Sequence, residues 1–232
     1  MVDTKSQAAS PTSPAGYLLD LGIYLTVLFT FRQLYLPGVP YMARVVLGSL
    51  LAVGVATWRM RARGVRWADL GLRKPENLGK TLIVTAVTVV AVVISIISFE
   101  ILKDLLPIEL APDTSSDGSR FGDLEGNFAL LLSIIGIVWL ESALEELMDR
   151  GFLLNWLERL FARPPMATIL AVLIQAILFG FRHSYDLSER SVTVGLIGLI
   201  LGIAYVACGR RLWPVILAHC VLNSLSMLER VF

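Results

Sequence analysis

The sequence predicts an all-α, polytopic transmembrane helical bundle with about seven (seven to eight) transmembrane helices. Hydrophobic residues make up 56% of the 232-residue chain, and charged residues make up only 17%. A soluble domain averages about 25% charged residues. The mean hydropathy is +0.71. Long apolar runs complete the pattern of a membrane protein.

Seven apolar runs are long enough to span a bilayer, since about 20 apolar residues cross the hydrocarbon core. In chain order they lie at about 17–36, 41–60, 81–102, 128–150, 166–183, 191–208 and 213–229. Residues 1–16 are polar and rich in Ser, Pro and Ala, so we expect a disordered N-terminal tail rather than a signal peptide. No internal repeat is visible, and residues 17–232 are predicted to form a single transmembrane helical domain.

The charges of the loops indicate which side of the membrane each loop faces. The segment 59–80 is strongly basic and should face the cytoplasm. Its basic residues are Arg59, Arg61, Arg63, Arg66, Arg73, Lys74 and Lys80. The segment 103–127 has no such bias, which fits the opposite side. Its charged residues are Lys103, Asp104, Glu109, Asp113, Asp117, Arg120, Asp123 and Glu125. Arg159 and Arg163, and then Arg210 and Arg211, agree with this alternation. We therefore expect a multi-pass membrane protein with a cytoplasmic N-terminus, in the plasma membrane if the source is a prokaryote.

The net charge and the cysteine content bear on which partners and metal sites are expected. The formal net charge of +1 does not indicate an acidic partner, and we expect no nucleic-acid binding. Cys208 and Cys220 lie in apolar surroundings, where packing is more common than a disulfide, and two cysteines are too few for a zinc cluster. The expected environment is the lipid bilayer, and the sequence does not indicate an oligomeric state.

A charged stretch, 139-WLESALEELMDRGFLLNW-156, follows a purely apolar run. Glu146 and Arg150 are four residues apart, so on a helix they can form an ion pair. Glu145 points about 100° away from Glu146 and needs its own partner. Glu141 and Asp149 lie on the face of Glu145. An unpaired acid at membrane depth costs roughly 2.5–3.5 kcal/mol on insertion scales, so a functional role is the first hypothesis.

A simpler interpretation of the same charges stays open at this point. The helix can leave the membrane here, with its acids solvated. In that case 151-GFLLNWLERLFAR-163 would be an interfacial amphipathic stretch.

The positions of the histidines favour a site. His183 closes 179-FGFRH-183, and His219 shares a helical face with Asn223 inside an otherwise apolar span. The prolines of 163-RPP-165 break the helix. Glu145 precedes this turn and His183 follows it, each by roughly 27–28 Å at 1.5 Å per residue. An antiparallel hairpin would therefore place the two side chains level, with a tip at about 151–163 protruding into the cytoplasm.

Three short motifs on successive apolar helices carry a family resemblance. They are EExxxR at 145–150, FxxxH at 179–183 and HxxxN at 219–223. In order and spacing they resemble the CPBP family of intramembrane proteases, which comprises CAAX proteases and bacteriocin-processing or Abi proteins. Eukaryotic CAAX prenyl protease 2 is a member. The similarity covers about 128–226, the expected catalytic core.

The resemblance implies a role for each motif residue. Glu145 and His183 would activate a water molecule for attack on a peptide bond. His219 and Asn223 would form the oxyanion hole. The implied supporting residues are Glu146, Arg150 and Phe179. In this metal-free, glutamic-type interpretation the enzyme needs no cofactor.

A metalloprotease mechanism is the alternative. Glu145, His183 and His219 could bind zinc and leave a fourth position for water. The family has been described in this way too. The HExxH motif of ordinary zinc proteases is absent from the sequence.

The chain departs from the family pattern at two positions. Asp149 stands where the family usually has an aromatic or aliphatic residue, and Glu141 is also unusual. Two added acids on the face of Glu145 would disfavour its ionised form by like-charge repulsion. We therefore expect these two acids to affect the pH optimum and the activity.

The expected substrate is a protein or peptide, prenylated or not. Within the family it is a prenylated CAAX protein, a peptide pheromone or a bacteriocin precursor. The alternatives are a non-catalytic membrane scaffold or bacteriocin-immunity protein of the same family, and a small transporter with a Glu/His proton relay. Gly198 and Gly202 form a GxxxG pattern that predicts close helix packing within the bundle.

Overall fold

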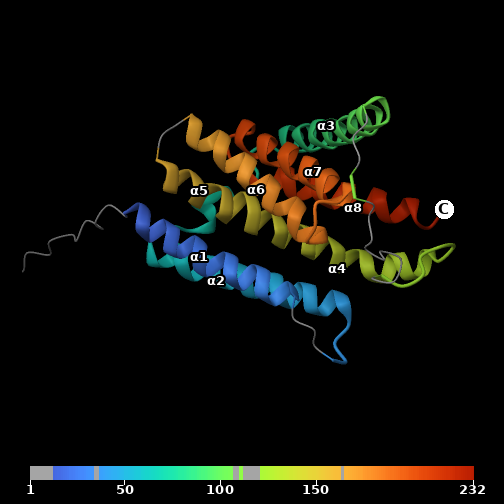
Figure 1. Cartoon of the computed structure of the whole chain (residues 1–232), viewed down its shortest axis with the longest axis horizontal. Helices are drawn as coiled ribbons and strands as arrows, with labels where there is room; N and C mark the ends of the chain where they lie inside the picture. The colour runs from blue at the N-terminus through green and yellow to red at the C-terminus, as the bar shows by residue number, and fades with distance from the viewer. Residues whose placement is uncertain (1–12, 34–36, 107–109, 112–120, 163–164) are drawn as a thin grey trace, which may run out of the picture.

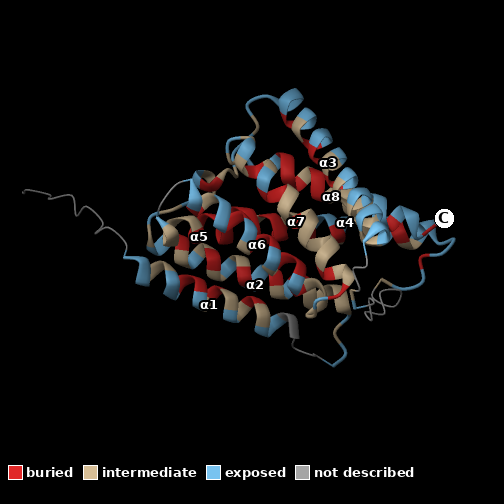
Figure 2. Ribbon diagram, turned by 45° about the horizontal axis from the view of Figure 1, so that its top comes forward, coloured by how far each residue is buried: buried red, intermediate tan, exposed pale blue. Residues whose placement is uncertain are grey.

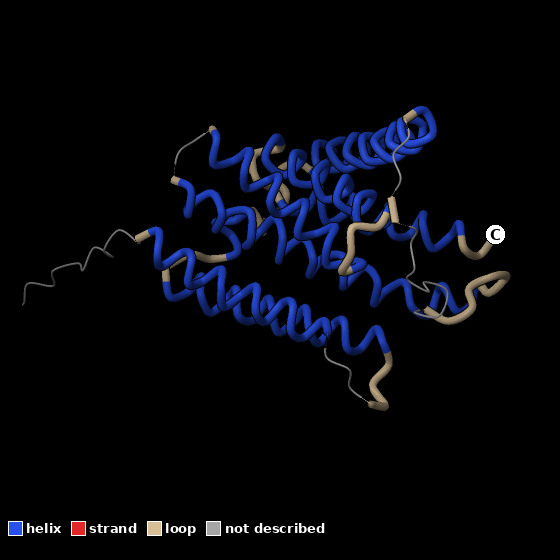
Figure 3. Tube along the Cα trace, viewed as in Figure 1, coloured by secondary structure: helices blue, strands red, loops and turns tan. Residues whose placement is uncertain are grey.

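A computed structural model describes residues 13–33, 37–106, 110–111, 121–162 and 165–232 of the chain. Within these residues seven helical segments are long and apolar enough to cross a membrane. The described chain contains helices joined by loops and turns, as Figure 3 shows. It also has one isolated β-bridge between Ala111 and Ser188. The predicted all-α polytopic fold and its count of seven spans are confirmed.

The helices follow the predicted order (Figure 1). They are α1 (Pro14–Gln33), α2 (Tyr41–Ala62), the 3-10 turn η1 (Trp67–Leu70), α3 (Leu78–Leu105), α4 (Phe128–Glu146), the π-helical turn η3 (Leu147–Leu153), α5 (Leu154–Phe161), α6 (Met166–Ser184), α7 (Glu189–Ala207) and α8 (Leu212–Glu229). The segments α4, η3 and α5 make one continuous span, Phe128–Phe161.

Two helix boundaries differ from the expected ones. The helix α1 begins at Pro14, so the expected tail of residues 1–16 overlaps its first turn. The fourth span continues to Phe161, eleven residues beyond the expected end at about 150. Residues 1–12, Arg163 and Pro164, and Glu109, Asp113, Asp117 and Arg120 lie outside the described residues.

The bundle places α1 and α2 on one side and α3 on the other, with α4 to α8 between them (Figure 1). Buried residues concentrate in the central helices, whereas α3 is largely exposed (Figure 2). Its exposed residues are large and apolar, including Ile83, Val87 and Ile94. Because hydrocarbon chains solvate such side chains, this face suits contact with lipid.

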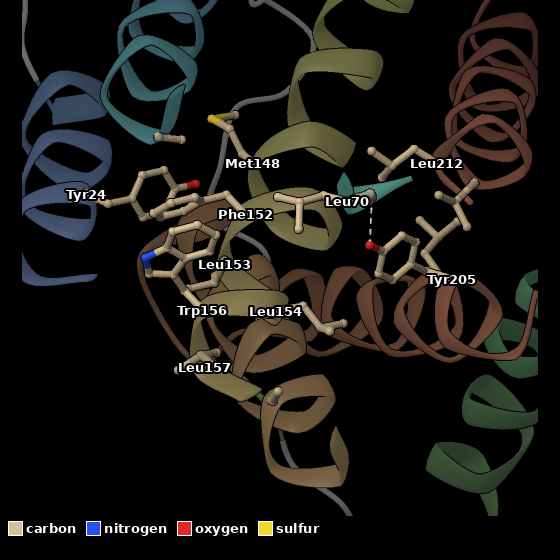
Figure 4. Close-up of a cluster of buried hydrophobic side chains, with 14 of the residues drawn as sticks. Tyr24, Leu70, Met148, Phe152, Leu153, Leu154, Trp156, Leu157, Tyr205 and Leu212 are labelled. Atoms are coloured by element: carbon tan, nitrogen blue, oxygen red, sulfur yellow. Dashed lines mark hydrogen bonds between the residues drawn. The ribbon is translucent and has the colours of Figure 1, made fainter. Parts of the chain in front are cut away.

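The expected cytoplasmic tip at 151–163 is wrong for its first half, which is a packed part of the bundle. Phe152 and Trp156 are fully buried, stack at 4.4 Å between ring centroids, and lie against Tyr24 of α1 (Figure 4). A long span can bury these aromatic groups because α1 covers them. Trp156 also donates a hydrogen bond of 3.0 Å from Nε1 to Asp20, which ties α5 to α1.

The basic segment after α2 is docked onto the end of the bundle. The Tyr205 hydroxyl donates a hydrogen bond of 2.8 Å to the Leu70 carbonyl (Figure 4), and the Leu212 amide donates one to Gly71. Gly71 has φ +97°, and a Cβ there would lie 1.9 Å from the Arg210 carbonyl oxygen. Only glycine permits this close approach of the two loops.

Small residues bring α6 and α7 together. A Cβ at Gly180 would lie 2.3 Å from the Ser191 carbonyl oxygen, and one at Gly198 would lie 3.0 Å from the Phe179 ring. Gly202 approaches Gln175 in the same way. The GxxxG prediction of packing within the bundle is confirmed, as expected where backbones approach in a membrane.

Candidate active site

The charged stretch passes from α-helix to π-helix immediately after Glu146. The π-turn η3 contains Asp149 and Arg150, and π-turns inside α-helices frequently occur at functional sites. Asn155 stabilises the widened turn because its Nδ2 donates hydrogen bonds of 2.9 Å to the carbonyls of Arg150 and Gly151. The altered helical period redirects the side chains that follow Glu146.

The acids of this stretch are buried, so the interpretation of a solvated helix end is wrong. Glu145 and Glu146 are 5% and 0% exposed, and Asp149 is 1% exposed. A buried carboxylate requires an ionic or hydrogen-bonding partner. The structure supplies such partners from α2, η3, α6 and α8.

Glu145 lies between the two histidines. Its Oε1 is 3.7 Å from Nε2 of His183 on α6, and its Oε2 is 3.7 Å from Nε2 of His219 on α8. The predicted hairpin, which sets Glu145 level with His183, is therefore present. His219 reaches the same carboxylate from α8.

Both histidines are oriented by a hydrogen bond at Nδ1. Nδ1 of His183 lies 2.6 Å from the Phe179 carbonyl oxygen, and Nδ1 of His219 lies 2.8 Å from Oε1 of Glu146. A carbonyl oxygen can only accept, so Nδ1 of His183 carries the proton. In the neutral ring, Nε2 of His183 is then a hydrogen-bond acceptor that faces Glu145.

Glu146 connects the site to the scaffold. The expected ion pair with Arg150 is present, with Nη1 donating to Oε1 at 2.8 Å between fully buried side chains. Nη2 of Arg150 also donates to the Gly198 carbonyl of α7 at 3.0 Å. One carboxylate oxygen thus accepts from both Arg150 and His219, which fixes the ring of His219 relative to α4 and α7.

Phe179 lies at the centre of the charged groups. The guanidinium of Arg150 is 4.7 Å from its ring centroid, and that of Arg182 is 4.9 Å away. Its ring also contacts those of His183 at 4.7 Å and His219 at 6.0 Å between centroids. A cation over an aromatic face is attracted to the ring, and this attraction strengthens when both are desolvated.

Asn223 lies one helical turn beyond His219 on α8. Its Nδ2 donates a hydrogen bond of 2.8 Å to Oγ of Ser142, and Ser142 in turn donates to the Val138 carbonyl. This contact uses one of the two N–H donors of the amide. Asn223 shares a cavity wall with Glu145, but no described contact joins it directly to the Glu145 carboxylate.

Arg182 is a site residue that the sequence reasoning missed. It is 1% exposed, and its guanidinium binds both carboxylate oxygens of Asp149, at 3.2 Å and 2.7 Å. Its Nη2 is also 3.3 Å from Oε1 of Glu145. An intramembrane acid calls for a partner, and the arginine beside His183 in an apolar helix was the signal that could have identified it.

The expected repulsion between Asp149 and Glu145 therefore needs a correction. A cation lies between the two carboxylates and attracts both, which offsets their like charge. Glu141 has a polar partner too, because Oγ of Ser49 on α2 donates to its Oε1 at 2.5 Å. The two departures from the family pattern are accommodated by residues elsewhere in the chain.

A cavity of about 950 Å³ adjoins the site. Its wall includes the side chains of Glu145, His183, His219 and Asn223, together with Phe179. Ligand pockets usually have volumes of about 300–1,000 Å³. The cavity is large enough for a short peptide segment, and it opens between α2, α3, α7 and α8.

The zinc alternative depends on the arrangement of the donor groups. Within the described residues, no group of three or more His, Cys, Asp and Glu side chains is arranged to hold a metal ion. In the set of Glu145, His183 and His219, Nδ1 of each histidine is engaged elsewhere, and both Nε2 atoms face the Glu145 carboxylate, as metal-ligating histidines are commonly held. The choice between the glutamic and the zinc mechanism stays a prediction, and no step below is routed through a metal.

Comparison with known proteins identifies the segment that carries this site. Residues 127–225 match the family described as type II CAAX prenyl endopeptidase, Rce1-like. The match begins at the N-cap of α4 and ends within α8, and it includes all three motifs. No curated protein and no solved structure matches the chain.

Proposed function

We propose that the chain, whose residues 127–225 match the CAAX-protease family, hydrolyses peptide bonds by a glutamate-activated water. The coarse activity, a CAAX-type endopeptidase in a multi-pass membrane protein, follows from the family and the seven spans. The observation that best supports the mechanism is the convergence of two Nε2 atoms on one buried carboxylate.

Water activation is assigned to Glu145 and His183. The carboxylate of Glu145 accepts a proton from water while the neutral His183 ring accepts a hydrogen bond at Nε2, which orients the water. The resulting hydroxide attacks the carbonyl carbon of the scissile bond. Arg182 lies 3.3 Å from Oε1 of Glu145, the oxygen that also faces His183, and so limits the positions of the carboxylate.

Stabilisation of the oxyanion is assigned to His219 and Asn223. Nδ1 of His219 is occupied by Glu146, so Nε2 can donate to an oxyanion only when the ring carries both protons. The second N–H of Asn223 is the other donor. When the tetrahedral intermediate collapses, the C–N bond breaks and the proton held by Glu145 passes to the leaving amine.

The supporting residues Glu146, Arg150 and Phe179 hold the proposed catalytic side chains in place. Glu146 and Arg150 join α4 to α7 and α8, and Phe179 packs between the cations. We further propose a cytoplasmic N-terminus, a plasma-membrane location if the source is a prokaryote, and a protein or peptide substrate, prenylated or membrane-associated. The basic loop at 59–80 supports this orientation.

The test compares cells that express the wild type with cells that express Glu145→Gln. New protein termini in membrane fractions are mapped by mass spectrometry. The matched control is Glu158→Gln, which removes another partly buried acid of the same span, one that pairs with Arg210 at 2.7 Å far from the cavity. Termini that occur with the wild type and Glu158→Gln but not with Glu145→Gln are expected.

The same comparison decides against the alternative of a scaffold or immunity protein. If all three proteins are folded and equally abundant and yield equal termini, the catalytic assignment is wrong. A phenotype preserved in Glu145→Gln would then support the non-catalytic role. Substrate-dependent proton flux in liposomes would instead indicate a transporter.

A further inference from the structure

The cavity extends from the site toward one end of the bundle only. Along α8 it is lined from His219 to Arg230, which spans about 16 Å at 1.5 Å per residue. Its lining residues on α2 begin at Tyr41, those on α3 end at Glu100, and those on α7 begin at Glu189. These three helix ends lie together with the end of α8 on the right of Figure 1.

The opposite direction is filled by side chains. From His219 to the first residue of α8 the distance is only about 10 Å along the helix. That space holds Leu212 and Val215, and Met148 and Leu153 from the π-turn, all 0% exposed. The site is thus nearer to this end of α8 but is closed toward it.

The charges at the two ends differ. The open end carries Glu100, Glu189 and Glu229 at the cavity mouth, together with Arg190 and Arg230, and Lys103 pairs with both Glu100 and Glu189. The closed end carries the basic segment 59–80 and Arg159, Arg210 and Arg211. Lysine and arginine in short loops mark the cytoplasmic side. The closed end is therefore cytoplasmic by charge, and the mouth faces away from the cytoplasm.

We propose that the cavity admits its substrate from the non-cytoplasmic face of the membrane, and that the substrate is an extended apolar peptide segment exposed there. This inference rests on the proposed function and names its substrate class. A protein prenylated in the cytoplasm cannot reach such a mouth from its own side. Among the family's substrate types, the structure therefore assigns exported or membrane-embedded peptides to this chain.

The lining of the cavity suits an apolar segment. Val93, Ile97 and Val194 face it from α3 and α7, and Leu222 and Leu225 face it from α8. An extended peptide whose alternate side chains are apolar would bury them against these walls. The polar groups of the site would then meet its backbone, which has the carbonyl that the mechanism requires.

The side of the mouth can be tested without catalysis. Cys208 and Cys220, which are free thiols, are replaced by alanine, and single cysteines are introduced by Ser226→Cys in the cavity and Lys74→Cys in the basic loop. A membrane-impermeant maleimide is applied to intact cells and to inverted membranes. Ser226→Cys should react in intact cells, and Lys74→Cys should react only in inverted membranes. Labelling of Ser226→Cys only in inverted membranes, or in neither, would overturn the proposal.

The substrate side is tested with two single-span reporters that carry the same apolar segment on opposite faces of the membrane. Co-expression with the wild type should cleave the non-cytoplasmic reporter, and co-expression with Glu145→Gln should not. Glu145-dependent cleavage of the cytoplasmic reporter alone, or of a prenylated CAAX reporter alone, refutes the access route and leaves the protease function intact. If Ser226→Cys is labelled in intact cells but neither reporter is cleaved, the proposed substrate class is refuted. The comparison of protein termini between the wild type and Glu145→Gln then decides whether the protein is a protease.

Discussion

Removing the charge of Arg182 should strongly destabilise the protein, and removing Asp149 as well should restore most of the loss. Arg182 and Asp149 are each 1% exposed and share two contacts. Breaking a buried pair by removing one partner leaves an uncompensated charge and costs about 3–5 kcal/mol. Two unit charges about 4 Å apart interact by roughly 4 kcal/mol at an effective dielectric of 20, which agrees in size.

The variants form a double-mutant cycle. Arg182→Met leaves Asp149 and Glu145 as facing acids, and Asp149→Asn leaves Arg182 with Glu145 alone. The double variant replaces the pair by neutral groups of similar size, which is often neutral for stability. We expect Arg182→Met to lose about 3 kcal/mol and the double variant to lose about 1 kcal/mol. Asp149→Asn should lose less than Arg182→Met, because Arg182 keeps its contact with Glu145.

The assay is reversible unfolding in mixed detergent micelles, with denaturation followed by tryptophan fluorescence. Arg182→Lys, which retains the charge but not the two-pronged contact, serves as an intermediate if Arg182→Met does not fold. The exposed guanidinium of Arg66, 3.4 Å from Asp69, is the control, and Arg66→Met should leave the unfolding curve unchanged. Single losses below about 1 kcal/mol that simply add in the double variant would refute the reasoning.

The double variant also separates stability from catalysis. Arg182 holds the Glu145 carboxylate at 3.3 Å, so a folded double variant should still cleave at least about tenfold more slowly. Wild-type cleavage by the folded double variant would show that Arg182 acts only through stability.

Two further predictions concern the oxyanion donor and the helix packing. Asn223→Ala should reduce kcat by roughly 10²–10³-fold with unchanged protein abundance. Ser142→Ala, which removes only the hydrogen-bond partner of Asn223, should reduce kcat by less. Equal losses of kcat in the two variants would contradict the assignment of Asn223 as an oxyanion donor. Gly180→Ala should lower the free energy of unfolding by about 1–3 kcal/mol, because its Cβ would lie 2.3 Å from the Ser191 carbonyl oxygen. Gly195→Ala, whose Cβ would have its nearest contact at 3.6 Å, should be tolerated. Equal stability of the two variants in thermal unfolding would show that α6 and α7 separate freely.

The fold and the meeting of Glu145 with His183 followed from simple chain geometry. Hydropathy located the seven spans because a bilayer imposes a helix length. The proline turn fixed the register of the hairpin, since equal numbers of residues on either side bring two positions level. The pair of Glu146 and Arg150 required only helical spacing.

The features that the sequence did not predict depend on long-range contacts. The π-turn changes the helical period after Glu146, and its partners, such as Asn155, act within the folded helix. Arg182 reaches Asp149 across 33 residues, and Ser49 reaches Glu141 across 92. The burial of Phe152 and Trp156 depends on α1, which periodicity along α5 does not place. For these reasons the stretch after Arg150 was wrongly predicted to protrude.

The residues that line the cavity come from two parts of the chain, one inside and one outside the segment that matches the family. The segment that matches the family, 127–225, contains Glu145, His183, His219 and Asn223. A large part of the wall comes from outside that segment, from the start of α2 and from α3 between Val93 and Glu100. A family match restricted to the catalytic segment constrains the chemistry but not this wall. Substrate choice should therefore vary with α2 and α3, while the reaction that we propose at Glu145 remains the same.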